Sequence, residues 1–99
     1  MSTRIYVAVD ADLLERLAAG ERISAPAFSA ASEDEEDELA ALEEAAEHGP
    51  VVAAADVDGS DEVTLEDIAS FHVDLDGSGD LAWFATQEID AVLRAAQKR

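Results

Sequence analysis

The sequence predicts a single α+β domain over residues 1–99, in which a mixed sheet of about four strands packs against about three helices. Strand-like apolar runs recur at residues 4–9, 51–57 and 71–75. Segments with helix-capping signals lie between and after these runs. The chain has 99 residues, of which 48% are hydrophobic, and this is enough for one modest core.

The N-terminal part of the chain predicts one strand followed by one helix. Side chains alternate along residues 4–9 as expected for a strand with one buried face. Asp10 or Asp12 can cap a short helix, and Gly20 supplies the residue able to adopt positive φ where that helix ends. Residues 21–31 are expected to form a connection. The expected buried face of the helix carries Leu13, Leu14 and Leu17.

A strongly acidic helix is expected next. The sequence S-E-D-E at 32–35 matches a capping box that begins at Ser32, and carboxylates suit the positive end of a helix dipole. Nine of the fifteen residues from 33 to 47 are acidic, and Gly49-Pro50 ends the helix. We interpret the charged side as a solvated face, with a partner-binding surface as the alternative. The expected apolar stripe contains Leu39, Leu42 and Ala46.

The second half of the chain predicts a buried strand and a final helix. Residues 51–57, VVAAADV, form a continuous apolar run, and a strand there could lie parallel to the first one through a right-handed crossover. Thr64 and Asp67 are expected to cap a turn or two of helix. Thr86 is expected to cap the last helix, whose predicted buried face contains Ile89, Val92, Leu93 and Ala96.

A β-hairpin is expected in the C-terminal half, between the buried strand and the last helix. The short strands 71–75 and 80–85 flank the glycine-rich loop DGSG. The length of this loop sets a register. The expected pairs are Leu75 with Asp80, Phe71 with Phe84, and His72 with Trp83.

Charge is the strongest compositional signal. Twenty-four acidic residues against six basic ones give a net charge of −18. Such a field repels DNA, RNA and anionic membranes, so direct binding to these partners is not expected. The acidity fits a host-wide composition or, alternatively, a mimic of nucleic-acid charge that inhibits a basic protein.

No stretch approaches the ~20 apolar residues of a membrane span and no signal peptide is recognised, so a cytoplasmic location is expected.

Residues 56–67, DVDGSDEVTLED, raise the question of a calcium site. An EF-hand-type loop needs glycine at its sixth position and a bidentate glutamate at its twelfth. Asp61 and Asp67 occupy these positions, although dockerin-type repeats accept aspartate at the last one. A second candidate, 74–85, ends at Ala85, which has no ligand atom. The segment before the first loop resembles a strand, so we expect turns and assign no metal ligand. A dockerin-like calcium protein stays an alternative.

The sequence assigns no catalytic residue and no cofactor. Cysteine is absent, and no dinucleotide-binding, P-loop or zinc-protease motif is present. His48 ends the acidic helix, where an imidazolium suits the dipole. His72 is expected to be a half-buried packing residue of a strand, with a general base as the alternative. Ser70 and Thr86 lack a triad-like setting. A small enzyme using His72 remains an alternative function.

Five segments carry a family resemblance. They are RIYVAVDADLLERL, DELAALEEAAE, VVAAADV, VTLEDIASFHVD and DLAWFATQEI, and they cover most of the chain. In this order they resemble a family of uncharacterised small actinobacterial proteins, a domain of unknown function with an HVD strand followed by W-[FY]-A-T-Q-E-I. Its members carry an additional helical segment where this chain has DGSG, which favours the hairpin. The resemblance implies a cytoplasmic actinobacterial α/β protein and no particular activity.

The functional hypothesis is a non-catalytic protein–protein interaction module. Its partner would be another protein, basic in charge, that binds the acidic helix 33–47 or the edge of the hairpin. The candidate binding residues are Trp83, Gln87 and Glu88. The alternative places Trp83 in the core and the other two in the first turn of a helix. A homo-oligomer also remains open.

Overall fold

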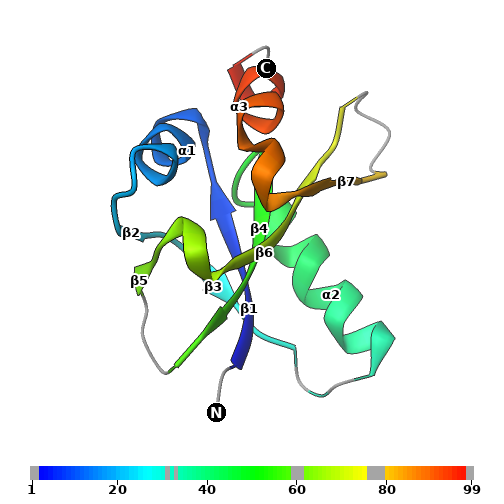
Figure 1. Ribbon diagram of the computed structural model, residues 1–99. Coiled ribbons are helices and arrows are strands. Elements are labelled where there is room, and N and C mark those ends of the chain that lie inside the picture. The colour runs from blue at the N-terminus through cyan, green and yellow to red at the C-terminus, as the bar shows by residue number, and fades with distance from the viewer. Residues whose placement is uncertain (1–2, 31, 33, 59–61, 76–79, 98–99) are drawn as a thin grey trace.

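The computed structural model shows an antiparallel sheet of five strands with helices on both faces (Figure 1). The strand order is β3-β1-β4-β6-β7. The structure describes residues 3–30, 32, 34–58, 62–75 and 80–97. The strands of the large sheet are β1 (Thr3–Val9), β3 (Ala27–Phe28), β4 (Val51–Val57), β6 (Ile68–Val73) and β7 (Ala82–Ala85), and a small second sheet pairs β2 (Ile23–Ser24) with β5 (Glu62–Val63).

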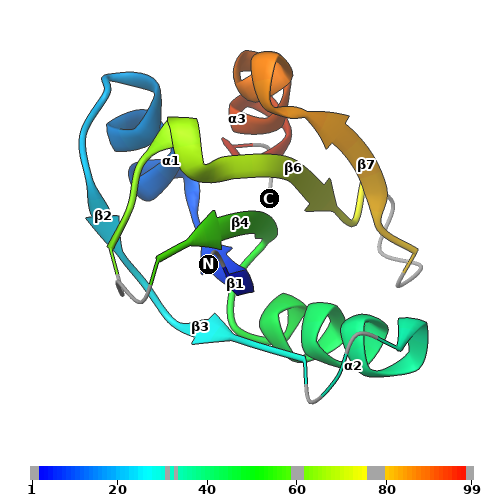
Figure 2. The same ribbon diagram turned by 60° about the horizontal axis from the view of Figure 1, so that its bottom comes forward.

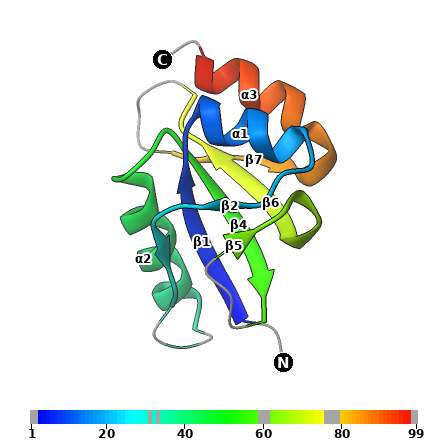
Figure 3. The same ribbon diagram turned by 90° about the vertical axis from the view of Figure 1, so that its left-hand side faces the viewer.

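The helices form two unequal layers. Helices α1 (Ala11–Ala18) and α3 (Ile89–Gln97) cover one face of the large sheet, and α2 (Glu35–Ala46) covers part of the other (Figure 2 and Figure 3). Short 3-10 helices precede β6 and α3, namely η1 (Leu65–Asp67) and η2 (Thr86–Glu88). In the described residues, no helix combines the length and the apolar character needed to cross a membrane.

The main core lies between the sheet and the pair α1 and α3. Strand alternation directs Val7, Ala53 and Phe71, which are neighbours across β1, β4 and β6, toward these helices. All three side chains are almost completely buried. The helices contribute fully buried side chains to the same core, namely Leu14, Leu17 and Val92.

The opposite face of the sheet carries a much smaller core. Ala41 and Ala45 of α2 pack against Tyr6, Val52 and Ala54. The side chains that α2 buries fully are alanines, and Leu42 and Ala46 are only partly buried, so this contact buries little apolar area. The helix packs mainly on β1, β3 and β4. The α2 side of β6 and β7 is therefore less covered.

The prediction of a mixed sheet is wrong, because β4 runs antiparallel to β1, with Val9 opposite Val51.

Residues 21–31, which were expected to form a connection only, contain the strands β2 and β3. Strand β3 pairs antiparallel with β1 and returns the chain along it before α2 begins. A Cβ at Gly49 would lie 3.1 Å from the carbonyl oxygen of Val9, so a larger residue would push the chain after α2 away from β1 by a few tenths of an ångström. Strand β4 therefore starts beside the end of β1.

The predicted hairpin is confirmed in its strand pairing. Phe71 pairs with Phe84 and His72 with Trp83, as the loop length indicated. The predicted pair of Leu75 with Asp80 is wrong, because the ladder ends at Val73 and Ala82 and the strands are Ile68–Val73 and Ala82–Ala85. The DGSG loop at 76–79 lies outside the described residues. The buried strand at 51–57 is also confirmed with the expected bounds.

Several capping predictions are confirmed as well. Asp10 caps α1 by accepting the Leu13 amide at 2.9 Å, and Gly20 has a φ of 84°. Thr64 and Asp67 form a capping box around η1. The predicted buried faces of α1 and α3 are those observed, with Leu13 and Leu93 partly buried.

Two predicted helix starts are wrong. The acidic helix begins at Glu35 with Asp34 as its N-cap, and the Ser32 hydroxyl instead donates to the Asp37 carboxylate. Thr86 caps no helix, because its hydroxyl donates to the Ile68 carbonyl at 2.6 Å and ties η2 to β6. The predicted apolar stripe of α2 is confirmed in part: Leu42 and Ala46 are partly buried against the smaller core, but Leu39 is exposed and the fully buried residues are Ala41 and Ala45.

Candidate functional site

The uncovered part of the sheet forms a groove with α2. We call this hollow of about 360 Å³ the α2–β7 groove. Its floor comes from β1, β4 and β6, one wall comes from α2, and β7 borders the other side. Its lining residues are Arg4, Tyr6, Glu35, Glu38, Leu39, Leu42, Ala54, Ser70, His72 and Trp83.

Two exposed apolar side chains line the groove from opposite elements. Leu39 of α2 is 53% exposed and Trp83 of β7 is 63% exposed. Trp83 faces this side because it pairs with His72, and the row of paired residues continues through Val52 to Ala8. Leu39 is exposed because α2 turns Ala41 and Ala45 toward the sheet, with Leu42 partly buried beside them. Large apolar side chains that are exposed together at one hollow are typical of an interaction site.

The floor of the groove contains a serine–histidine pair. The Oγ of Ser70 lies 3.0 Å from Nε2 of His72. Burial, and to a smaller extent the positive charge of Arg4, lowers the pKa of His72, so the neutral imidazole is favoured, and its tautomer decides which of the two groups donates the hydrogen bond. This pair was not predicted from the sequence. The i, i+2 spacing in a strand was the available signal, because it places both side chains on one face.

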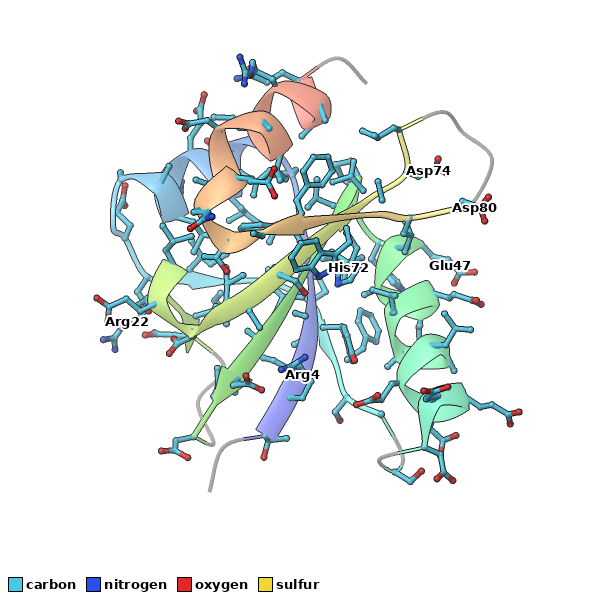
Figure 4. The ribbon with its side chains drawn as sticks, turned by 45° about the vertical axis from the view of Figure 1, so that its right-hand side comes forward. Arg4, Arg22, Glu47, His72, Asp74 and Asp80 are labelled. Carbon is cyan, nitrogen blue, oxygen red and sulfur yellow. The ribbon has the colours of Figure 1, made fainter. Side chains whose placement is uncertain are left out.

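An arginine–aspartate pair lies at the N-terminal end of β1, next to the groove. Arg4 and Asp56, opposite each other across β1 and β4, form two side-chain hydrogen bonds of 2.7 and 3.1 Å. This bidentate pair raises the pKa of Arg4 and lowers the pKa of Asp56. Figure 4 shows Arg4 and His72 on the side of the sheet that faces α2. A second hollow of about 600 Å³ continues beyond Arg4 toward Thr3 and Ser32.

The first residue of the calcium-like pattern is therefore engaged in a side-chain ion pair. Asp56 belongs to β4 and points across the sheet to Arg4. Residues 59–61 of this pattern lie outside the described part of the chain, as does the 76–79 segment of the second one. Within the described residues, no group of three His, Asp or Glu side chains is placed to hold a metal ion.

The three candidate binding residues are divided between two places. Trp83 lines the α2–β7 groove, whereas the described lining includes neither Gln87 nor Glu88. Both lie exposed in η2, where the Glu88 carboxylate accepts the Ala85 amide at 2.9 Å. The alternative that placed Trp83 in the core is wrong, because its partner His72 faces away from the main core. The acidic first turn of α2 adds Glu35 and Glu38 to the groove.

The remaining aromatic and histidine residues near α2 have packing roles. The His48 ring stacks on Phe28, with centroids 5.0 Å apart and the planes 25° from parallel. This contact fastens the turn after α2 to β3. In the described part of the chain His72 has no carboxylate partner, so it forms a pair with Ser70 rather than a triad.

The lowered pKa of His72 predicts a pH dependence of stability. A histidine whose pKa falls below 6.5 on folding binds fewer protons in the folded state, so its contribution to stability is complete above about pH 7 and is lost as the pH falls. We expect His72→Gln to remove this loss. Urea unfolding of both proteins between about pH 7.5 and 5 measures the difference, with His48→Gln as the control. A constant difference across this range would contradict the expectation.

Comparisons of the chain with protein-family models, with curated proteins and with solved structures gave no match. The α2–β7 groove and the carboxylates that line it are therefore the features from which function is inferred.

Proposed function

We propose that the protein is a cytoplasmic, non-catalytic interaction module that binds a basic segment of another protein in the α2–β7 groove. The observation that carries the proposal is the position of Leu39 and Trp83, which are exposed on the two sides of one hollow. Tryptophan is one of the residue types enriched among those that dominate binding energy at protein interfaces.

Charge supports a basic partner. Six of the twelve residues of α2 are acidic, and two of them, Glu35 and Glu38, line the groove. The whole chain carries −18. A positively charged segment would be attracted over a distance of about a Debye length and would then contact the carboxylates at the groove. The same charge disfavours a second copy of the chain as the occupant.

The resemblance to the actinobacterial family is consistent with this proposal and adds no partner. Its most telling motif, WFATQEI, begins with Trp83 and ends with Ile89. In this chain the motif spans the edge strand, η2 and the first residue of α3. We propose that the tryptophan belongs to the binding surface, while Ile89 anchors the motif in the main core.

A matched pair of charge-neutralising variants tests the proposal. Glu35→Gln with Glu38→Gln removes two charges from the groove, and Glu66→Gln with Asp90→Asn removes two exposed charges elsewhere. The tagged proteins are used for capture from an actinobacterial lysate, and the recovered partner is then titrated with each variant. We expect the groove variant to bind about three- to tenfold more weakly, because each exposed ion pair is worth about 0.2–1 kcal/mol.

The control variant keeps the same net charge as the groove variant, so general electrostatic attraction is equal in the two. Equal affinities for both variants would show that the carboxylates act only through net charge and would remove the groove from the proposal. Capture should also fall at high salt, because screening weakens exposed ion pairs.

A further inference from the structure

We propose that the partner segment binds in an extended conformation as an added strand along the free edge of β7, which borders the α2–β7 groove, so that its side chains on the α2 side extend past Trp83 toward the groove. This inference rests on the proposed function and specifies the conformation and chemistry of the occupant. The occupant is a basic segment of another protein, which would become a sixth strand of the large sheet. Addition of a strand to an open sheet edge is a common mode of peptide recognition, in which the backbone supplies affinity and alternate side chains supply specificity.

β7 is the last strand of the sheet. The order β3-β1-β4-β6-β7 leaves it with a single neighbour, β6, among the described strands. Figure 2 shows β7 on the outer side of β6. The opposite edge is less suitable, because β3 has two residues and is followed closely by α2.

The backbone of β7 presents Trp83 toward the open side. The Ala85 amide donates to the Glu88 carboxylate, so it points away from β6. In an antiparallel strand the N–H and C=O of one residue point to the same side, and this direction alternates along the strand. Trp83, two residues before Ala85, therefore also directs its N–H and C=O away from β6. Because these groups point away from β6, Trp83 and His72 form a pair without backbone hydrogen bonds between them, and in such pairs the two side chains lie close together.

Glu88 also sets the limit of the available edge. By accepting the Ala85 amide it ends the outward row of donors at that residue. A segment added along β7 would consequently form its central hydrogen bonds with Trp83. On the α2 side of the sheet, the side chain that the segment places opposite Trp83 would contact the indole.

The chemistry around Trp83 selects a cationic side chain at that position. The indole face attracts a guanidinium or ammonium group by a cation–π interaction. Glu35 and Glu38 line the same groove as Trp83, so the electrostatic field on this side of the sheet also favours a cationic side chain. A second copy of this chain would instead bring together two molecules that each carry −18. The partner segment is therefore basic, with cationic residues at alternate positions.

The experiment uses the full chain and a peptide of about ten residues with alternating arginine and valine, long enough to cover one strand. Two isomers of this peptide carry N-methyl groups, one on every arginine amide and the other on every valine amide. Each isomer retains all side chains and loses the hydrogen-bond donors along one edge. Binding is followed by the fluorescence of Trp83, the one tryptophan of the sequence.

We expect saturable binding of the unmodified peptide, a loss of about tenfold or more for one isomer, and affinity within about threefold for the other, since one edge alone loses its hydrogen bonds. Equal binding of all three peptides would overturn strand addition but leave the groove as a docking site. Absence of saturable binding by the unmodified peptide would also overturn the inference. The proposed function itself is decided by the matched capture experiment, which uses no peptide.

Discussion

Replacing Phe71 with alanine is expected to lower the free energy of unfolding by about 3–5 kcal/mol. The side chain is fully buried on β6, which lies between β4 and the edge strand β7. It belongs to the main core together with residues of α1 and α3, so the cavity would lie where several elements meet. A domain of this size is stable by about 5–15 kcal/mol, and the variant would therefore lose a large part of its stability.

Urea unfolding followed by circular dichroism measures this loss. Leu75→Ala is a suitable control, because Leu75 follows the same strand and is 58% exposed. The control should change stability by less than about 0.5 kcal/mol. Similar unfolding curves for both variants would mean that the main core does not depend on Phe71.

Replacing Trp83 with alanine is expected to have the largest effect on binding. A central tryptophan at an interface contributes about 2 kcal/mol or more, which is roughly a 30-fold loss of affinity for the basic partner or peptide. The fold should tolerate the change, because the side chain is 63% exposed. Since the variant lacks the fluorescent reporter, calorimetry or anisotropy of a labelled peptide provides the measurement.

Two further variants make the result specific to the groove. Leu75→Ala removes another exposed apolar side chain and should leave affinity unchanged. Trp83→Phe keeps an aromatic face and should retain part of the affinity. If Trp83→Ala binds as tightly as the unaltered protein, the α2–β7 groove is not the binding surface.

Local signals in the sequence predict the second half of the fold well. A buried strand of continuous apolar residues, a hairpin loop of known length and capping residues each act within a few positions. The pairing of His72 with Trp83 follows from the loop length alone. This pairing also fixes the face on which Trp83 lies, and so predicts one border of the groove.

The first half illustrates the limits of such signals. Strand β3 has two residues and no recognisable pattern, yet it reverses the chain along β1 and makes the sheet antiparallel. The orientation of α2 depends on which side chains fit closely against the sheet, and Ala41 and Ala45 occupy the fully buried positions where Leu39 was expected to contribute. Leu39 consequently lies in the groove rather than in the core, an outcome that only tertiary packing determines.

The thin contact of α2 has a consequence for the motions of the molecule. Segments with little buried apolar area open at a lower free-energy cost than the main core, and their amide hydrogens exchange with solvent sooner. The alanine contacts make α2 such a segment, whereas β4 and β6 are held by the main core. One wall of the groove is thus attached more weakly than its floor, and the amide hydrogens of α2 are expected to exchange sooner than those of β4 and β6.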